Sequence, residues 1–394
     1  MMVKIAVINS HPIQYFAPLY KELNKNNDLE VTALYLSDLN LKPSLDPGFK
    51  QEIKWDIDML DGYNYKFIGN YQKNRPNGFW SLIVPQLWQE IRGSEYDAIW
   101  LHGYNFAAYL VAFFAAKSKG IKVFFRGESH LKLHRSRSKD IVHKIFCKFL
   151  FRYVDAFLAI GSANKEYYKS YGVCEKNIFL VPYTIDNIRF RVKRGLIDEE
   201  VKNLKTQIGL SKHPTIIFAS KFMERKRPQD LLKAAEILQK NKLKFNVLFV
   251  GSGELEESLY DLARKHNLEN IFFQGFVNQS SLPIIYSACD VFVLPSINEP
   301  WGLVINEVMS CGLPVIIAKG VGAAYDLVKE GINGYTFDPM DAEDLAEKLQ
   351  TILSDDSLRL EMSKQSINII DSWSYTECVE GVQSALKDTG LIQE

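Results

Sequence analysis

Residues 291–307 read VFVLPSINEPWGLVINE, and this stretch indicates the fold class. Val291–Leu294 is a short, wholly apolar run, which is typical of a strand buried on both faces of a parallel sheet. A loop, Pro295–Pro300, follows the run and leads into a predicted helix that Gly302 and Leu303 open. Repeated units of strand, loop and helix build doubly wound α/β domains.

The same alternation of apolar runs and helix-length segments extends from end to end of the chain. At 394 residues the chain is too long for one ordinary core. We therefore predict an α/β fold of two Rossmann-like doubly wound domains, at about residues 1–185 and 190–370, with little new sheet beyond Gly334. The predicted strands are Val3–Asn9, Glu30–Leu36, Tyr65–Ile68, Ala98–Leu101, Lys122–Phe125, Ala156–Ile160, Ile178–Val181, Thr215–Ala219, Asn246–Val250, Ile271–Gln274, Val291–Leu294 and Pro314–Ile317.

The composition is that of a globular protein, with 47% apolar and 24% charged residues. The five cysteines are scattered and never spaced C-x-x-C, which argues against a disulfide framework or a structural zinc site. The longest apolar run, Tyr109–Ala116, is far shorter than the ~20 residues that a membrane span needs. The N-terminus has no signal-peptide pattern, so we expect a cytoplasmic protein.

Charge is distributed unevenly along the chain. Residues 1–185 hold 24 Lys and Arg against 17 Asp and Glu, a balance of +7, and the remainder has a balance of −7. The segment Arg135–Arg152 reads as a cationic amphipathic helix, with Lys139 among its basic residues. One interpretation is a peripheral contact with an anionic membrane at its inner face. The other is a helix whose apolar stripe packs on the sheet, within a surface of chance charge imbalance.

Two carboxylates flank the start of the helix that follows Val291–Leu294. Glu299 lies in the loop and Glu307 about one and a half turns into the helix. A carboxylate accepts paired hydrogen bonds from vicinal sugar hydroxyls, so two carboxylates suit a nucleotide sugar. The free backbone N–H groups at Gly302 and Leu303 suit an anion. The alternative is that Glu299 caps the helix and Glu307 is solvated.

Basic residues follow the predicted strand Thr215–Ala219. Lys221 and Lys226 are placed to neutralise a departing diphosphate. The alternative is a solvated basic loop, to which Arg225 and Arg227 would also belong. After the next strand, the turn at Gly251-Ser-Gly253 is interpreted as a tight turn near the nucleotide rather than a direct phosphate cradle.

In this order the motifs resemble those of the retaining glycosyltransferases of family 4, which share the GT-B fold, with two Rossmann-like domains facing a central cleft. The resemblance covers about residues 215–340. Its motifs are Lys221 and Lys226, Val250-Gly-Ser-Gly-Glu254, Gly275-Phe-Val277, Leu294-Pro-Ser296, the pair Glu299 and Glu307, Cys311-Gly-Leu-Pro-Val315 and Glu330-Gly-Ile-Asn-Gly-Tyr335.

The resemblance implies a role for each of these residues. Glu307 would hold the ribose hydroxyls, and Glu299 would bind the donor sugar and stabilise its developing positive charge. Lys221 and Lys226 would bind the diphosphate. Backbone groups would complete the donor site, with Gly302 and Leu303 at the diphosphate, Phe276 and Val277 at the base, and Gly251 and Gly253 nearby.

Two positions depart from the family pattern. The family usually has Gly-Arg where this chain has Ser220-Lys221, so a bidentate phosphate contact gives way to a point charge. The family also usually has glycine where this chain has Arg227. The positive charge at position 221 is kept, but the geometry with which the site would bind the donor differs from that of the family.

The first half resembles the family less closely. Polar residues again follow the predicted strands, and each is interpreted either as a cleft residue that binds acceptor or orients donor, or as a structural polar contact. These residues are His11, Gln14, His102, Arg126, Glu128 and His130.

The resemblance implies a retaining hexosyltransferase that uses a nucleoside diphosphate sugar, UDP more than GDP, and no metal or other cofactor. The acceptor would be a glycan or lipid-linked molecule of surface polysaccharide or glycolipid synthesis, with no nucleic-acid partner. A terminal helix at 372–394 would return to the first domain. Two alternatives stay open, a nucleotide-sugar 2-epimerase and a non-catalytic nucleotide-sugar-binding partner protein. Asp56 and Asp58 form a D-x-D far in sequence from the donor loops and are not interpreted as a metal site.

Overall fold

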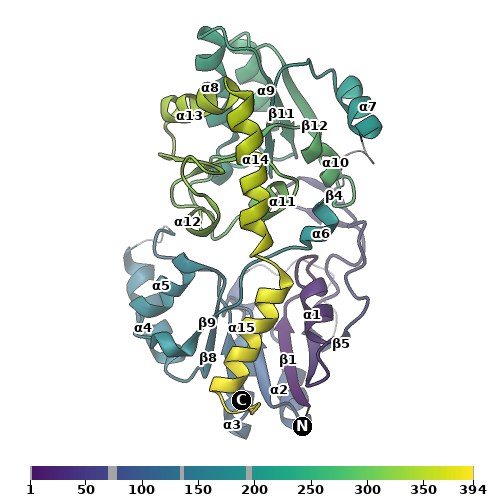
Figure 1. Ribbon diagram of the computed structural model, residues 1–394. Helices are drawn as coiled ribbons and strands as arrows, with labels where there is room; N and C mark the ends of the chain where they lie inside the picture. Colours follow the sequence, from purple (N-terminus) through teal and green to yellow (C-terminus); the bar gives the residue numbers. More distant parts are fainter. Residues whose placement is uncertain (1, 70–77, 134–136, 192–197, 394) are drawn as a thin grey trace. The chain divides into compact units, whose positions relative to one another are not determined.

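The computed structural model describes residues 2–69, 78–133, 137–191 and 198–393. The chain divides into two compact units, each with a parallel sheet covered by helices (Figure 1), so the predicted α/β class is confirmed. Unit 1 comprises Met1–Ser44, Ile57–Tyr183 and Ser374–Glu394. Unit 2 comprises Leu45–Asp56 and Thr184–Trp373.

Unit 1 is built on a parallel sheet with strand order β5-β2-β1-β6-β7-β8-β9. The bounds are β1 Val3–Asn9, β2 Leu29–Tyr35, β5 Asn64–Phe67, β6 Ala98–Leu101, β7 Lys122–Phe125, β8 Ala156–Ala159 and β9 Ile178–Leu180. Its helices are α1 Ala17–Leu23, α2 Gln86–Gly93, α3 Ala107–Lys119, α4 Arg137–Phe151, α5 Ser162–Ser170 and α15 Tyr375–Asp388.

The central strand β1 shows why both faces of this sheet are covered. Ile5 and Val7 belong to one buried cluster, whereas Ala6 and Ile8 belong to the other. Successive side chains of a strand point to opposite faces, so a wholly apolar strand needs helices on both sides. Helix α3 supplies one cover, and α1 and α15 supply the other.

Helix α15 packs on the sheet of unit 1, against β8 and β9 (Figure 1). Its start is fixed by a capping box, in which Ser374 and Glu377 satisfy each other's backbone N–H groups. At Gly381 the helix lies so close to the sheet that an added Cβ would sit 1.9 Å from the Leu180 carbonyl oxygen. Glycine is therefore required at this contact.

Unit 2 has a parallel sheet with strand order β12-β11-β10-β13-β14-β15. The bounds are β10 Thr215–Ala219, β11 Asn246–Val250, β12 Ile271–Gly275, β13 Val291–Leu294, β14 Val315–Ala318 and β15 Gly334–Phe337. The helices are α6 Asn187–Phe190, α7 Asp198–Ile208, α8 Pro228–Lys240, α9 Glu256–Lys265, α10 Leu282–Ser287, α11 Val304–Ser310, α12 Ala324–Leu327, α13 Ala342–Leu353 and α14 Asp356–Asp371.

Beyond Gly334 the described residues add little sheet, as predicted, but they include one strand that was not among the predicted ones, β15, which pairs in parallel with β14. This strand is short and begins with a glycine, a residue that is depleted in strands, so its sequence signal is weak. A side chain at Gly334 would collide with β14, because an added Cβ would lie 1.8 Å from the Val315 carbonyl oxygen.

A further difference concerns residues 45–56, which we call the strap. Its chain neighbours on both sides belong to unit 1, and the sequence prediction placed it in the first domain, but its contacts group it with unit 2. The strap includes most of a small sheet formed by β3 Ser44–Asp46 and β4 Gln51–Ile53. Its polar and loop-like sequence gave no such signal.

Within the described residues, no helix is both long enough and apolar enough to cross a bilayer.

Candidate functional site

The residues predicted to bind a donor lie in unit 2 on the loops that follow its strands. Lys221 follows β10, Gly251 follows β11, Phe276 follows β12 and Glu299 follows β13. These strands are neighbours in one parallel sheet, so their carboxyl ends share an edge. That edge is where ligands bind in open α/β sheets.

The centre of this edge is a cluster of three charged side chains, one of which, Arg225, is partly exposed. Glu299 accepts a hydrogen bond from Arg225 Nη1 at 2.9 Å and pairs with Lys226 Nζ through the same carboxylate oxygen. Lys226 and Glu299 are both buried. Lys226 ends a short 3-10 turn, Glu224–Lys226, which directs it and Arg225 toward the β13 loop. The structure thus brings together Glu299 and Lys226, which the sequence predicted as a site, and adds Arg225.

The two cations decide the ionisation of Glu299. Burial acts to raise the pKa of its carboxyl group, but the charges of Lys226 and Arg225 and their hydrogen bonds outweigh burial and hold that pKa below its usual value. Burial lowers the pKa of Lys226, and Arg225 adds to this effect while Glu299 opposes it. The cluster carries one net positive charge in its ionised state, which favours an anionic ligand.

Glu307 lies on α11 and is 2% exposed, with its carboxylate bound by the Tyr286 hydroxyl at 2.8 Å. The alternative of a solvated Glu307 is therefore wrong. The other half of that alternative also fails, because the residue at the helix cap is Leu303 and not Glu299. Gly302 stands just before it at φ 95°, in a region of backbone space that favours glycine.

The turn at Gly251-Ser-Gly253 packs against the loop that carries Lys221. An added Cβ at Gly251 would lie 2.1 Å from the Ser220 carbonyl oxygen, and one at Gly253 would lie 2.5 Å from that of Phe222. The Phe222 amide also donates to the Ser252 carbonyl oxygen at 2.9 Å. These contacts agree with the interpretation of a tight turn.

A second glycine loop supports Glu299 from the other side. An added Cβ at Gly322 would lie 1.8 Å from the Pro300 carbonyl oxygen, and the Gly322 amide donates to the Glu299 carbonyl oxygen at 3.1 Å. The close approach that glycine permits at Gly322 and the hydrogen bond of its amide therefore hold the backbone that carries Glu299.

Arg227, where the related family usually has glycine, adopts a left-handed backbone conformation with φ 55°. Its guanidinium group makes a bidentate pair with the buried carboxylate of Asp230, at 2.8 and 2.7 Å. This pair offsets the cost of a side chain in a conformation that suits glycine. Arg227 is therefore a structural residue rather than a solvated one.

The strap covers the remaining donor residues. The Asp46 carboxylate accepts a hydrogen bond from Lys221 Nζ at 2.8 Å, and the Lys221 ammonium lies 4.8 Å from the centroid of the Phe49 ring. Phe49 and Trp55 make edge contacts with Phe276, at centroid distances of 5.0 and 6.2 Å. Val277 beside Phe276 is half-buried.

The predicted cleft residues of the first half all lie in unit 1, on loops that follow β1, β6 and β7. Their exposure varies. His11, Gln14 and His102 are partly exposed, Arg126 and His130 are buried, and Glu128 is exposed.

Arg126 is held by backbone carbonyls and aromatic rings. Its Nη2 donates to the carbonyl oxygens of Val181 and Pro182, at 3.3 and 3.1 Å. Its guanidinium carbon lies 5.1–5.7 Å from the centroids of the Phe16, Trp100 and Tyr183 rings. Nη1 is buried and has no hydrogen-bond partner among the residues that the structure describes.

His102 belongs to the same cluster. Its ring stacks on Phe16 at 4.4 Å, and its Nε2 lies 3.0 Å from the Tyr20 hydroxyl. Burial holds the pKa of His102 well below its usual value, and the charge of Arg126 lowers it further. His102 is therefore a neutral ring at physiological pH.

The remaining cleft residues have local partners. His11 Nδ1 lies 2.9 Å from Ser10 Oγ, and His130 Nδ1 accepts a hydrogen bond from the Lys132 amide at 3.2 Å. Glu128 accepts a hydrogen bond from the Tyr183 hydroxyl at 2.7 Å. These contacts leave both interpretations of the residues, acceptor binding and structural contact, as predictions.

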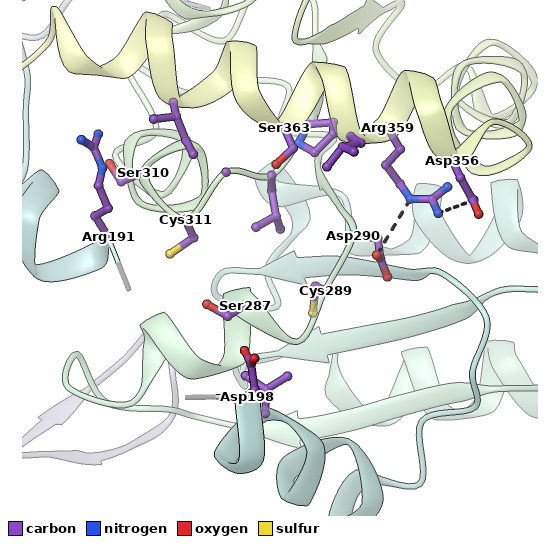
Figure 2. A pocket seen from close by; sticks show the side chains of 16 residues that line it. Arg191, Asp198, Ser287, Cys289, Asp290, Ser310, Cys311, Asp356, Arg359 and Ser363 are labelled. Carbon is purple, nitrogen blue, oxygen red and sulfur yellow. Dashed lines mark hydrogen bonds and ion pairs between the residues drawn. The ribbon is translucent and has the colours of Figure 1, made fainter. Parts of the chain in front are cut away.

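A pocket elsewhere in unit 2 lies apart from the candidate site. Figure 2 shows it between α14 and the β13 side of the sheet, with Arg359 directed toward Asp290 and Asp356. Asp290 immediately precedes β13, and Pro314 in the lining immediately precedes β14. The pocket therefore lies at the amino ends of these strands, at the edge opposite the donor residues.

The sequence missed three residues of the candidate site. Arg225 was left open as a solvated residue, Tyr286 carried no motif, and Asp46 lies 175 residues from its partner Lys221. The basic composition of the β10 loop was a usable signal for Arg225. Nothing in the local sequence pattern of Asp46 pointed to unit 2.

Comparison with known families shows what the region that carries this edge of unit 2 is similar to. Residues 200–369 match the family described as Glycosyl transferases group 1. These residues form a glycosyltransferase group 1 domain. The match includes Lys221, Lys226, Glu299 and Glu307 and excludes the strap.

Curated relatives support the same assignment. An uncharacterized glycosyltransferase of Methanocaldococcus jannaschii is 31% identical over 160 residues, which are 40% of this chain and 40% of the relative. The N,N'-diacetylbacillosaminyl-diphospho-undecaprenol alpha-1,3-N-acetylgalactosaminyltransferase of Campylobacter jejuni is 23% identical over 230 residues, 58% of this chain and 59% of that protein. The chain thus spans about half the length of the curated relatives it matches.

Among solved structures, the Anabaena protein HepE in complex with UDP superimposes with a TM-score of 0.74 at 17% identity, covering 98% of this chain and 100% of that chain. This likeness confirms the GT-B fold class predicted from the motifs.

Proposed function

We propose that the glycosyltransferase group 1 domain makes this protein a retaining glycosyltransferase. It moves a hexose-type sugar from a nucleoside diphosphate sugar, UDP rather than GDP, to a glycan or lipid-linked acceptor of surface polysaccharide or glycolipid synthesis. The observation that carries the proposal is the buried ion pair of Glu299 and Lys226, which Arg225 joins, beside the buried carboxylate of Glu307.

In the proposed reaction the bond between the anomeric carbon and the diphosphate breaks, and a bond to the acceptor oxygen forms on the same face of the sugar. Lys226, Arg225 and Lys221 stabilise the negative charge that develops on the departing diphosphate. Glu299 binds the sugar hydroxyls and stabilises the positive charge on the ring, and Glu307 holds the ribose. The acceptor proton passes to an oxygen of the departing phosphate, so the proposal requires no protein nucleophile and no metal.

The proposal uses charges that are already fixed in place before the reaction. Glu299 and Lys226 are buried and their ion pair is preformed, so little reorganisation is needed when charge develops. The net positive charge of the cluster suits a diphosphate. In unit 1, Arg126 and the polar residues around it are the proposed acceptor contacts.

A peripheral contact with an anionic membrane belongs to the same proposal, since a lipid-linked acceptor would be presented at the inner face of a membrane. Helix α4 buries Cys147, Leu150 and Phe151, as the packing interpretation predicted. It also exposes Ile141, Val142, Ile145 and Phe149, next to the exposed Lys144 and Lys148. Arg135 and the side chain of Lys139, also counted in the predicted helix, lie outside the described residues.

A thermal-shift screen tests the proposed donor. UDP, GDP, ADP and their common sugars are added without metal to the wild type and to Glu307→Gln. A ligand at ~100 times its dissociation constant stabilises the fold by about 2.7 kcal/mol. We expect one nucleotide class, that of uridine, to raise the melting temperature of the wild type but not of the variant.

The matched control is Glu257→Gln, an exposed carboxylate on α9. It is expected to respond as the wild type does. If no nucleotide shifts the wild type, the donor site is wrong. If UDP-sugar binds and is converted without any acceptor, the protein is an epimerase instead.

A further inference from the structure

The strap, residues 45–56, contacts each of the loops that follow β10, β11 and β12. Ser252 Oγ in the glycine turn donates to the Phe49 carbonyl oxygen at 2.8 Å. Asn278 Nδ2, just beyond the predicted base-reading residues, donates to the Lys54 carbonyl oxygen at 2.7 Å. The strap is therefore tied at two points of its backbone to loops of the donor edge.

Asp46 is the charged residue of the strap that reaches the candidate site. It is 6% exposed. Its Oδ1 accepts hydrogen bonds from the Gly48 and Phe49 amides of its own turn, at 2.8 and 3.1 Å, and from Lys221 Nζ. Because the turn fixes the Asp46 carboxylate, this carboxylate determines the position of the ammonium group at the end of the flexible Lys221 side chain.

Two further contacts restrict the Lys221 side chain. An added Cβ at Gly48 would lie 2.5 Å from Lys221 Cδ, so glycine leaves the space that the lysine stem occupies. The Phe49 ring lies beneath the ammonium group at 4.8 Å. A lysine side chain has large rotamer freedom, and the strap removes most of it before any ligand arrives.

The ammonium group nevertheless keeps capacity for a ligand. It has three N–H donors, and Asp46 Oδ1 takes one of them. The Lys221 side chain is 28% exposed, whereas that of Asp46 is 8% exposed. Of the two paired side chains, that of the cation Lys221 is therefore the more exposed.

We propose that Asp46 is a positioning residue for Lys221, and that it holds the ammonium where it binds the diphosphate of the donor. This inference rests on the proposed function and extends it to a segment outside the matched family region. Under this proposal the strap contributes residues to the donor site. The alternative is that Asp46 competes with the donor for Lys221, in which case the diphosphate would have to displace the Asp46 carboxylate.

The test measures binding of UDP and of uridine by titration, in the wild type and in four variants. Asp46→Asn keeps the acceptor oxygen for the turn but removes the charge that holds Lys221. Gly48→Ala keeps every charge but places a methyl group where the lysine stem lies. Lys221→Met removes the ammonium, and Asp46→Asn with Lys221→Met is the double variant.

We expect Asp46→Asn and Gly48→Ala to weaken UDP binding about tenfold, which corresponds to one charge-assisted hydrogen bond. Uridine has no phosphate, so its affinity is expected to stay within about twofold of the wild-type value, since the base and ribose contacts remain. The double variant is expected to bind UDP no more weakly than Lys221→Met alone, because Asp46 acts through the lysine. Glu52→Gln, an exposed carboxylate of the same strap, is the control and is expected to bind UDP like the wild type.

Three results would overturn the inference while leaving the proposed function intact. Tighter UDP binding by Asp46→Asn would make Asp46 a competitor. Unchanged UDP binding would make the pair irrelevant to the donor. An equal loss of affinity for uridine and for UDP would mean that the strap only supports the structure of the site. A wild type that binds no nucleoside diphosphate would overturn both the inference and the proposed function.

Discussion

The two units balance their buried charges in different ways. In unit 2, Lys226 and Lys221 are paired with carboxylates, Glu299 and Asp46. In unit 1, Arg126 rests on backbone carbonyls and aromatic rings, and the nearby His102 is neutral. Paired charges can be shared with an incoming anion that carries charge of its own, whereas Arg126 is held in place by neutral groups. Under the proposed function, this difference assigns the stabilisation of the departing diphosphate to unit 2.

The largest effect is expected at Glu299. Glu299→Gln keeps the shape of the side chain but removes the charge that pairs with Lys226 and Arg225 and that would stabilise the sugar cation. We expect kcat to fall about 10²–10³-fold, the size found when one preorganised electrostatic group is removed. Steady-state transfer assays measure this loss, with Glu257→Gln as the exposed control. Wild-type kcat in Glu299→Gln would break the assignment of chemistry to unit 2.

Arg126 provides the matching test in unit 1. Arg126→Met removes two hydrogen bonds to carbonyls and contacts with three rings, so we expect the free energy of unfolding to fall by about 2 kcal/mol. Donor affinity is expected to stay unchanged, because Arg126 lies in unit 1. Chemical denaturation and UDP titration measure the two quantities.

Arg92→Met is the control for that experiment, because Arg92 also lies over a ring, that of Trp88, but is exposed. A change within about 0.5 kcal/mol is expected there. If Arg126→Met lost donor affinity and kept its stability, the contrast between the units would be reversed.

The sequence predicted most of the sheet, because strands such as Val291–Leu294 are buried on both faces and are apolar throughout. It also placed Lys221, Lys226 and Glu299 on loops at one sheet edge, and Glu307 on the helix that follows one of these loops. It could not pair Lys221 with Asp46, since a contact across 175 residues leaves no periodic signal. β15 was missed because it is short and starts with a glycine that packs against β14.

The neutral state of His102 gives a smaller, pH-dependent effect. The folded pKa of His102 is lowered, so below the ordinary histidine pKa of about 6.5 the unfolded chain binds a proton that the folded chain does not. The contribution of His102 to stability is therefore complete above that pH and declines as the pH falls. We expect a loss of up to about 1.4 kcal/mol per pH unit from this one group.

The contribution of His102 is isolated by measuring the free energy of unfolding of the wild type and of His102→Gln between pH 8 and pH 5. The difference between the two proteins is expected to shrink steadily as the pH falls below about 6.5. A constant difference across this range would mean that His102 titrates alike in both states. Unit 1 would then not hold a neutral ring beside its buried cation.

The smallest effect is expected on the surface of unit 1. Ile145 on α4 is 67% exposed, between the exposed residues Lys144 and Phe149 and away from the buried face of the helix. Ile145→Glu is expected to reduce co-sedimentation with phosphatidylglycerol vesicles several-fold and to leave UDP binding unchanged, because it removes an apolar contact and adds a repelled charge. Ile188→Glu, which changes an exposed isoleucine of unit 2, is the control and is expected to sediment like the wild type. Equal losses of co-sedimentation in both variants would mean that lipid contact is not confined to α4. The proposal that unit 2 binds the donor and unit 1 contacts the membrane would then be wrong.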